Sequence, residues 1–381
     1  MQAAVSPPYQ LITEPHELER LAAELEAETM IGVDLEADSM FHFQERVCLL
    51  QIGTRNSSFV VDTIRIADAT PLKAVFRSPR TRKVCHGADY DVRSLYRDFE
   101  IRVTTLFDTQ LACRLLGYKE TGLEAVLKNL FGVALDKKYQ RKDWSRRPLP
   151  EEMLAYAASD VRHLVPLAEQ LEAELRSRHR LAWAAEECRL LSRVRPSLND
   201  ERPLFLSCKG AGRIDPRGLA VLEGLLDLRR RLARAKDRPL FKVFSHEALL
   251  KLAEHRPTSV EELERAGALS RSQSERHGAE ILDAIRQALR VPADQLPRYP
   301  RRKAQTVSAA AARRIQSLRR WRDAQARRLK IDPSLVCTKA AINAIAARRP
   351  ANPEELTDIA EIKRWQRKAF GEEIIAALAR A

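Results

Sequence analysis

Four carboxylates and one tyrosine, spread between residues 34 and 160, have the side-chain types needed to hold divalent cations. They are Asp34 and Glu36 in MIGVDLEAD, Asp91 in CHGADYD, and Tyr156 and Asp160 in YAASD. Carboxylates are hard oxygen ligands suited to magnesium and manganese. A pair of such ions about 4 Å apart turns water into a nucleophile and stabilises the oxygens of an in-line phosphoryl displacement. The pattern therefore predicts a two-metal nuclease.

The predicted local structure places each group of acids where it can reach the same ions. Residues 30–36 are an apolar, strand-like run in which Asp34 and Glu36 alternate with apolar side chains, so both project from one face. Asp91 follows the strand-like segment RKVCHG and precedes a helical pattern. Ligands collect at such strand-to-helix turns in α/β sheets. The nearby Asp89 is predicted to cap that helix.

The third fragment is predicted to be helical. Two acids follow Pro148 and Pro150, and helical periodicity continues through residues 151–175. Tyr156 and Asp160 are four residues apart and therefore lie on one helical face. Each fragment alone also fits solvated acids or a core ring. The combination favours a metal site, because a carboxylate such as Asp34 in an apolar segment is costly without a cation.

The chain resembles the 3′→5′ exonucleases that have four acidic ligands and a tyrosine in the third motif, and in particular ribonuclease D. The resemblance covers roughly residues 9–195. Beyond the five motif residues it rests on connecting segments: FDTQLA at 107–112, GL at 122–123, KDWS at 142–145 and RPL at 147–149.

This resemblance implies a role for each motif residue. Asp34 would bridge two divalent cations, either Mg²⁺ or Mn²⁺. Glu36 and Asp160 would complete the site that activates water, Asp91 would help to hold the second ion, and Tyr156 would orient the attacking water. The implied reaction is stepwise hydrolysis from a free RNA 3′ end, with transfer RNA precursors as substrates and nucleoside 5′-monophosphates as products. No obligate protein partner is evident.

Three domains are predicted along the chain. Residues 1–200 alternate strand and helix signals, which predicts an α/β exonuclease domain with a mixed sheet, and the resemblance implies that it is ribonuclease H-like. Three close strands between residues 30 and 62 are predicted to form an antiparallel meander. Residues 212–292 and 304–381 are predicted to be all-α helical bundles that repeat one layout. The first resembles the helicase and ribonuclease D C-terminal domain, and the second is a divergent copy.

The excess of positive over negative charge is confined to the C-terminal half. The net charge is +14, yet residues 1–200 hold 28 Lys and Arg against 30 Asp and Glu, whereas residues 201–381 hold 38 against 22. Such an excess is typical of a nucleic-acid partner. Two basic clusters are candidate RNA-binding segments, one interleaved with aromatic rings before Tyr156 and one on a predicted helix. The candidate contacts are Lys138, Arg141, Lys142, Trp144, Arg146, Arg313, Arg314 and Arg320. A solvated helix face, and for Trp144 a structural anchor, remain alternatives.

Several other classes are disfavoured. No apolar run approaches the ~18 residues that span a membrane, and the N-terminus does not resemble a secretory signal, so a cytoplasmic protein is expected. The six cysteines are widely spaced and indicate neither zinc nor a disulfide framework. Two functional alternatives stay open: a 3′→5′ DNA exonuclease of repair type, and an inert nucleic-acid-binding scaffold. RNA versus DNA preference, the preferred metal, the oligomeric state and the role of the bundles also stay open.

Overall fold

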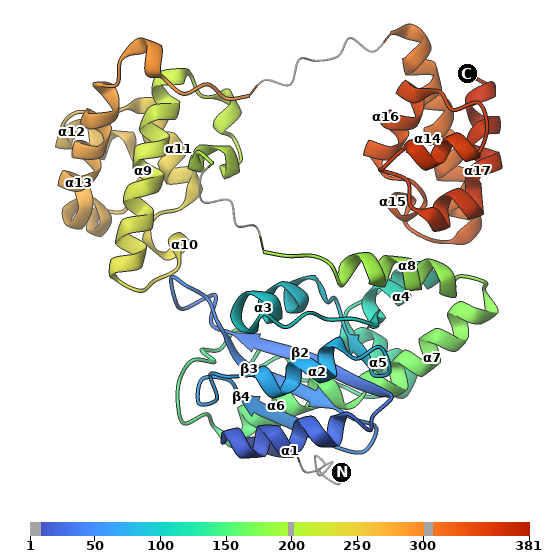
Figure 1. Ribbon diagram of the computed structural model, residues 1–381. Helices are drawn as coiled ribbons and strands as arrows, with labels where there is room; N and C mark the ends of the chain where they lie inside the picture. The colour runs from blue at the N-terminus through green and yellow to red at the C-terminus, as the bar shows by residue number, and fades with distance from the viewer. Residues whose placement is uncertain (1–8, 197–201, 301–307) are drawn as a thin grey trace. The chain divides into compact units, whose positions relative to one another are not determined.

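The computed structural model describes residues 9–196, 202–300 and 308–381, which form two compact units (Figure 1). The first unit contains residues 9–37, 47–196 and 308–381, and the second contains residues 38–46 and 202–300. The units do not follow chain order, because the C-terminal bundle belongs with the N-terminal domain. The domain ends predicted at residues 200 and 304 lie outside the described residues.

A six-stranded mixed sheet forms the centre of the first unit, as predicted. The strand order is β1-β4-β3-β2-β5-β6. The strands are β1 Tyr9–Ile12, β2 Met30–Ala37, β3 Val47–Gly53, β4 Ser58–Asp62, β5 Arg82–Cys85 and β6 Leu106–Asp108. Strands β2, β3 and β4 pair antiparallel, which confirms the predicted meander, while β1, β5 and β6 pair in parallel with their neighbours.

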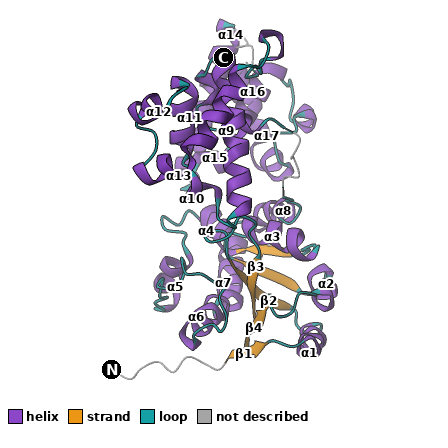
Figure 2. Ribbon diagram, turned by 90° about the vertical axis from the view of Figure 1, so that its left-hand side faces the viewer, coloured by secondary structure: helices purple, strands orange, loops and turns teal. Residues whose placement is uncertain are grey.

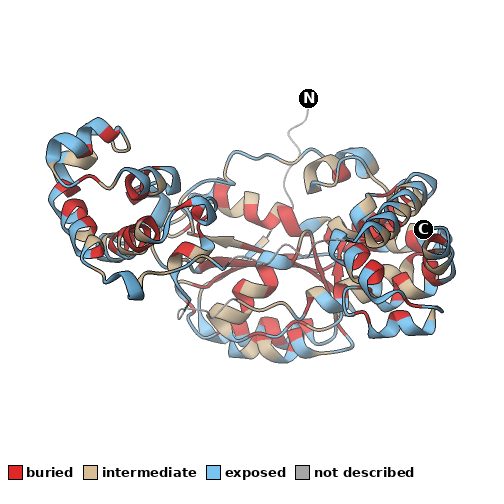
Figure 3. Ribbon diagram, turned by 90° about the horizontal axis from the view of Figure 1, so that it is seen from above, coloured by how far each residue is buried: buried red, intermediate tan, exposed pale blue. Residues whose placement is uncertain are grey.

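Helices cover both faces of this sheet, with α1 and α2 on one side and α5 and α6 on the other (Figure 2). Their inward faces are buried and their outer faces exposed (Figure 3). The helices of this part are α1 Pro15–Leu25, α2 Thr70–Arg77, α3 Asp89–Phe99, α4 Thr109–Leu116, α5 Leu123–Phe131, α6 Glu151–Arg162, α7 Leu164–Ser177 and α8 Leu181–Leu191. No helix in the described part of the chain is long and apolar enough to cross a membrane.

The two helical bundles have the same order of elements. Each contains a long helix, a helix of four residues, a helix of ten residues and a long final helix. The second unit contains η1 Leu204–Ser207, η2 Ala211–Arg213, α9 Pro216–Ala235, α10 Leu240–Val243, α11 His246–His255, α12 Val260–Ala266, α13 Arg271–Leu289 and η3 Ala293–Gln295. The C-terminal bundle contains α14 Ala309–Leu329, α15 Pro333–Val336, α16 Lys339–Arg348, η4 Glu354–Asp358 and α17 Arg364–Ala379. A 3-10 turn thus replaces α12 in the C-terminal bundle.

The C-terminal bundle packs on α8 of the N-terminal α/β domain through a continuous apolar core. Trp183 stacks on Trp365 with ring centroids 4.5 Å apart. The Glu186 carboxylate accepts hydrogen bonds of 2.8 Å from the first two backbone N–H groups of α17. Glu187 accepts from the Lys363 ammonium at 2.6 Å and from the Trp365 indole at 2.9 Å. Packing against the N-terminal α/β domain is therefore one role of this bundle.

Loss of the Glu187 carboxylate should destabilise this unit. Because its side chain is only 11% exposed, Glu187→Ala leaves two donors without their partner, and we expect a loss of about 2 kcal/mol in the free energy of unfolding. Chemical denaturation of the full chain measures it. Glu169→Ala is the matched control, since the Glu169 pair with Arg55 is exposed on both sides and such pairs contribute less than about 1 kcal/mol. Equal losses would show that Glu187 does not hold the bundle.

Candidate active site

Strand β2 presents its two acids to the face of the sheet that α6 covers. Ile31, Val33 and Leu35 pack into the core beneath α1 and α2. Because side chains alternate along a strand, Asp34 and Glu36 point to the opposite face. Helix α6 packs against β2, β3 and β4 on that face. The predicted placement of both acids on one face therefore agrees with the strand as it folds.

Two glycines allow the end of α6 to approach the sheet closely. Gly32 on β2 and Gly53 on β3 are partners in the strand register. A Cβ atom on Gly53 would lie 2.6 Å from the Val161 carbonyl oxygen, and one on Gly32 would lie 2.9 Å from the Leu164 Cβ. This approach brings Asp160, the residue before Val161, against β2. Sequence analysis missed both glycines, although a glycine inside a strand is a known signal of close backbone approach.

The HGADYD segment contains two acids, and the structure separates their environments. Asp91 lies in the first turn of α3 and is only 7% exposed. Asp89 is exposed and accepts two hydrogen bonds from Arg93, at 2.8 and 3.0 Å. The prediction that Asp89 caps α3 is wrong, because Ala88 occupies the cap position and no side chain caps this helix. The structure thus places Asp91, and not Asp89, with the buried acids.

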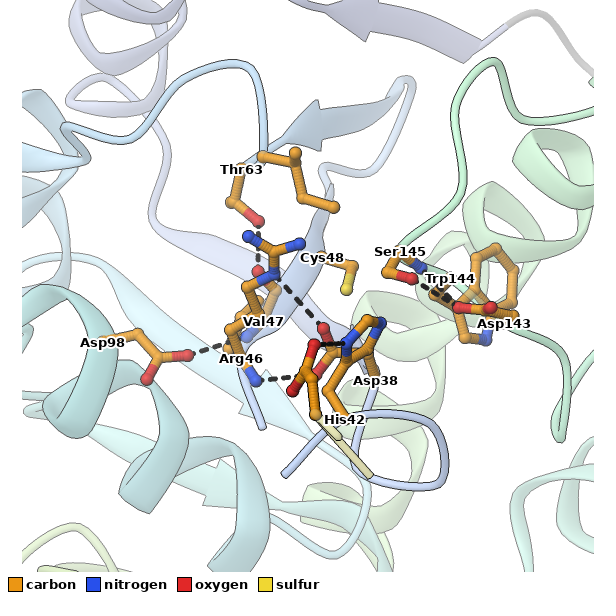
Figure 4. A network of polar contacts seen from close by, with 12 residues as sticks. Asp38, His42, Arg46, Val47, Cys48, Thr63, Asp98, Asp143, Trp144 and Ser145 are labelled. Carbon is orange, nitrogen blue, oxygen red and sulfur yellow. Dashed lines mark hydrogen bonds and ion pairs between the residues drawn. The ribbon is translucent and has the colours of Figure 1, made fainter. Parts of the chain in front are cut away.

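Trp144 supports Tyr156 from inside the protein. The two rings stack with centroids 6.1 Å apart, and Tyr139 meets the Tyr156 ring edge-on at 5.9 Å. Figure 4 shows Trp144 within the turn that the Asp143 carboxylate closes by accepting a hydrogen bond from the Ser145 hydroxyl. Trp144 is 1% exposed. The expected RNA contact of Trp144 does not fit this burial, so the alternative of a structural anchor is the one that the structure favours.

The acids share an electrostatic environment that disfavours their charged forms. Burial and the neighbouring Asp34, Asp160 and Asp91 raise the pKa of Glu36 to about 10. Burial is also the main cause that raises the pKa values of Asp34, Asp91 and Asp160, and the Asp34 charge adds to the shift of the latter two. The structure therefore brings all four acids into one interacting group, as predicted. Such repulsion is relieved when cations bind.

The hydroxyl of Tyr156 belongs to the same group. Burial and then the Asp160 charge raise the pKa of Tyr156 far above its usual range, and a hydrogen bond to Asp160 contributes. The phenol therefore keeps its proton at neutral pH. It can donate one hydrogen bond and accept another, which are the properties required for orienting a water molecule.

The residues present fit hard divalent ions. Besides the four carboxylates, Gln51 lies opposite Asp34 in the strand register, and neither polar atom of its buried amide has a hydrogen-bond partner among the described residues. In the same part of the chain, no three His, Cys, Asp or Glu side chains are arranged to enclose a metal ion by themselves. Magnesium usually keeps several waters and uses one or two carboxylates together with substrate phosphates. The donor set therefore suits ions that complete their coordination with water and substrate.

A pocket of about 410 Å³ opens beside Asp34, Tyr156 and Asp160. Its other walls come from the start of α5 and from the loop after it. His86 lines this pocket, but both its ring nitrogens are engaged, at 2.8 Å from the Thr109 hydroxyl and 2.8 Å from the Thr121 carbonyl. His86 therefore orders the pocket wall, and the acids remain the groups available for chemistry.

The predicted RNA contacts lie in two places. Lys138, Arg141, Lys142 and Arg146 are exposed in the loop between α5 and α6. Arg313, Arg314 and Arg320 lie on α14 of the C-terminal bundle. The first two of these donate to backbone carbonyls of Ala381 and Ala346, and Arg320 lines a groove of about 660 Å³ between α14 and α17. Arg146 of the loop pairs with Asp143 at 3.1 Å, so Lys138, Arg141 and Lys142 are the more freely available of these cations.

Comparison with known proteins identifies the family. Residues 9–176 match a 3′-5′ exonuclease model, and residues 218–285 and 311–378 each match an HRDC domain model. Ribonuclease D of Escherichia coli is 31% identical over 290 residues, which cover 76% of this chain and 77% of that protein. The chain belongs to the ribonuclease D family. The crystal structure of E. coli RNase D agrees in fold, with a TM-score of 0.76, 27% identity and coverage of 98% and 99% of the two chains.

Longer proteins share the same region with this ribonuclease D homologue. Protein RRP6-like 2 of Arabidopsis thaliana is 34% identical over 298 residues, which cover 74% of this chain. The chain spans only 34% of the length of that protein and 46% of RRP6-like 1 from the same plant. The exonuclease family to which it belongs generally uses divalent metal ions.

Divalent cations should stabilise this ribonuclease D homologue more at pH 8 than at pH 5. The folded-state pKa values of the site carboxylates are raised, so the metal-free fold is most stable below the unfolded pKa of about 4 and loses stability as the pH rises through the folded values. Cations relieve the repulsion only where the acids ionise. The unfolding temperature is measured with manganese and with EDTA at each pH. An equal rise in unfolding temperature with manganese at pH 5 and at pH 8 would contradict a metal site made of carboxylates.

Proposed function

We propose that this chain is a metal-dependent 3′→5′ exoribonuclease that removes nucleotides one at a time from RNA 3′ ends. The observation that carries the proposal is the group of four mutually repelling acids, of which Asp91 and Asp160 are buried, beside a protonated tyrosine and a pocket large enough for a nucleotide. Such a group is costly in a fold unless it serves a ligand of opposite charge. Membership of the ribonuclease D family supports the same activity.

Each residue of the site has a proposed part in hydrolysis. Asp34, Glu36, Asp91 and Asp160 would hold two ions, Mg²⁺ or Mn²⁺. Bound ions of this kind supply a hydroxide-like nucleophile and offset charge on the phosphate. Tyr156 holds its proton and orients the attacking water through its hydroxyl. Attack on the last phosphodiester breaks the bond to the preceding 3′ oxygen, so a nucleoside 5′-monophosphate leaves and the shortened chain keeps a 3′-hydroxyl.

The proposed substrate is RNA with a free 3′ end, and transfer RNA precursors are the proposed physiological class, in the cytoplasm. Lys137 of the α5–α6 loop lines the pocket, where it pairs with Glu124, and the exposed Lys138, Arg141 and Lys142 follow it in the same loop. Cations beside a site that cleaves phosphodiesters suit a polyanionic strand. The E. coli RNase D described with the crystal structure is an exoribonuclease involved in structured RNA processing, which supports structured RNA as the substrate class here.

Hydrolysis of end-labelled oligonucleotides tests the activity and separates its alternatives. The 5′-labelled RNA and DNA of one sequence are incubated with the full chain in magnesium, in manganese and in EDTA. We expect a ladder of RNA products that shorten from the 3′ end only with metal, together with free 5′-monophosphates. Faster cleavage of DNA would indicate the DNA exonuclease, and binding without cleavage in either metal would indicate an inert scaffold.

Tyr156→Phe should lower turnover with little change in RNA affinity. The substitution keeps the ring and its stack on Trp144 but removes the hydroxyl that orients water. The lost hydrogen bond acts mainly in the transition state, so we expect kcat to fall by about 10² to 10³-fold. Single-turnover rates and KM on one RNA oligomer measure the two effects. A raised KM with an unchanged kcat would make Tyr156 a binding residue.

A further inference from the structure

Exposed apolar side chains gather at one end of the second unit. Met40 is 47% exposed in the loop of residues 38–46, and Leu240 and Phe241 of α10 are 39% and 52% exposed. The Lys242 ammonium lies 4.5 Å from the centre of the Phe41 ring, which joins the loop to α10. We name these five residues, together with Arg234 and Arg238, the end surface.

The loop half of the end surface is held in a defined conformation. At its base the buried Asp38 carboxylate accepts hydrogen bonds from Arg46, at 2.8 Å from the backbone N–H and 3.2 Å from Nε (Figure 4). At its tip Asp237 lies 2.7 Å from the His42 Nδ1 and accepts from the Phe43 backbone N–H at 3.1 Å. Phe43 packs on the core of the unit. The exposed side chains are therefore presented by an ordered loop.

Cations surround these apolar side chains with little compensating charge. Residues 234–242 contain four Lys and Arg, of which Lys236 is hydrogen-bonded to His277, and a single acid, Asp237, which is already engaged by the loop. Arg234, Arg238 and Lys242 are exposed. The Arg234 guanidinium lies 5.5 Å from the Phe43 ring. Stackable rings and unneutralised cations on one surface are the combination that holds single-stranded nucleic acid.

A groove elsewhere in the same unit is negatively charged, so the surface of this unit is not uniformly basic. A groove of about 580 Å³ between α9 and α13 is lined by Glu223, Asp227, Glu280 and Asp283, with Arg231 as its single basic residue. Arg231 is paired with Asp227 in that groove. A polyanion is repelled from this groove, so charge directs it to the end surface.

We propose that the end surface binds single-stranded RNA, with Phe241 and Phe41 stacking on bases and with Arg234, Arg238 and Lys242 on phosphates. The proposal rests on the proposed function for its choice of RNA. In the chain, the loop begins two residues after Glu36, directly after the end of β2. None of its residues belongs to the α5–α6 loop or to α14, the two segments predicted from the sequence to contact RNA.

Binding of a twelve-nucleotide single-stranded RNA to the full chain tests the surface. Measurements are made in an Asp34→Asn background, which prevents cleavage, over a series of salt concentrations. We expect Phe241→Ala to weaken binding roughly tenfold. The double variant Arg234→Ala/Arg238→Ala should also make the log-log salt slope shallower by about 1.4, since each phosphate contact on a single strand contributes about 0.7.

Two matched controls isolate the surface. Val260→Ala trims another exposed apolar side chain of the unit, 55% exposed at the start of α12, and Arg231→Ala removes one charge from α9 in the acidic groove. Both should leave RNA affinity near that of the background. Equal RNA affinity in Phe241→Ala and Val260→Ala, or an unchanged salt slope in the double variant, would overturn the proposal and leave the surface to a protein partner or a second copy.

Hydrolysis of a dinucleotide separates this proposal from the proposed function. In this proposal a dinucleotide is held by the pocket beside the acids alone, so Phe241→Ala with an intact Asp34 should cleave it at the wild-type rate. The wild type could fail to cleave any RNA while RNA binding still depends on Phe241. That result would contradict the proposed exoribonuclease activity and support the proposed RNA-binding surface. A dinucleotide rate that falls with Phe241→Ala would overturn a purely binding role.

Discussion

Asp91→Asn is expected to lower RNA hydrolysis about a thousandfold, whereas Asp89→Asn, two residues away in the same turn, should keep the wild-type rate within about twofold. Asp91 is buried among the site acids and its pKa is raised well above its usual range, first by burial and then by Asp34 and Asp108. Asp89 is exposed and its pKa is lowered by the hydrogen bond to Arg93. An amide at residue 91 therefore removes a charge that we propose binds metal, while one at residue 89 removes a surface ion pair.

The stability of these two variants provides the control. Without metal, Asp91→Asn removes one of several repelling acids, so its unfolding temperature in EDTA should equal or exceed that of the wild type. Asp89→Asn should lose no more than about 0.5 kcal/mol, the usual contribution of an exposed i,i+4 pair. Single-turnover hydrolysis and thermal unfolding measure both. If the two substitutions lowered activity equally, or if only Asp89→Asn did, the assignment of the second-motif acid would be reversed.

Gly53→Ala is expected to lower activity by about a hundredfold although the glycine carries no functional group. The added methyl would lie 2.6 Å from the Val161 carbonyl oxygen, and backbone atoms cannot yield as a flexible side chain can. Helix α6 must therefore move away from β3, carrying Asp160 and Tyr156 with it. A displacement of about 1 Å in a catalytic group can cost about a hundredfold in rate, and overpacking adds a loss of about 1 to 3 kcal/mol in stability.

A second glycine substitution separates local crowding from a general effect of alanine. Gly122 has a φ of −72° and is the N-cap of α5, and an added Cβ there meets nothing within 4 Å, so Gly122→Ala should cost no more than the roughly 1 kcal/mol by which a helix N-cap prefers glycine to alanine. The binding constant for manganese, measured by calorimetry on Gly53→Ala, should weaken together with the hydrolysis rate. Wild-type metal affinity and activity in Gly53→Ala would show that α6 does not need its close approach to β3.

Local patterns in the sequence carried most of the information about the catalytic domain. The alternation at residues 31–36 predicted one strand with two acids on one face, and the structure has β2 with that pattern. The spacing of Tyr156 and Asp160 predicted one helical face, and α6 provides it. Periodicity is a property of neighbouring residues and of backbone geometry, so it can be read before the fold is known.

Contacts between segments far apart in the chain could not be predicted from the sequence. The burial of Trp144 against Tyr156 depends on how the α5–α6 loop folds back on the sheet, and an aromatic residue among cations is equally typical of an RNA contact. The pairing of Asp89 with Arg93, in place of a helix cap, depended on where α3 begins. Helix boundaries are set by competition between local caps and tertiary packing, which single-sequence patterns do not resolve.

The sequence by itself predicted the candidate site of this protein, with its four acids and its tyrosine, together with an α/β domain and two helical bundles. Only the tertiary structure decided which segments belong to each unit, because that depends on which apolar surfaces meet. The C-terminal bundle packs on α8 through Trp183 and Trp365. Residues 38–46, which follow β2, instead contact the first bundle through Asp237. Burial of apolar area is non-directional and does not depend on sequence order, so partners 176 and 178 residues apart are chosen by surface shape and hydrogen bonding in the fold.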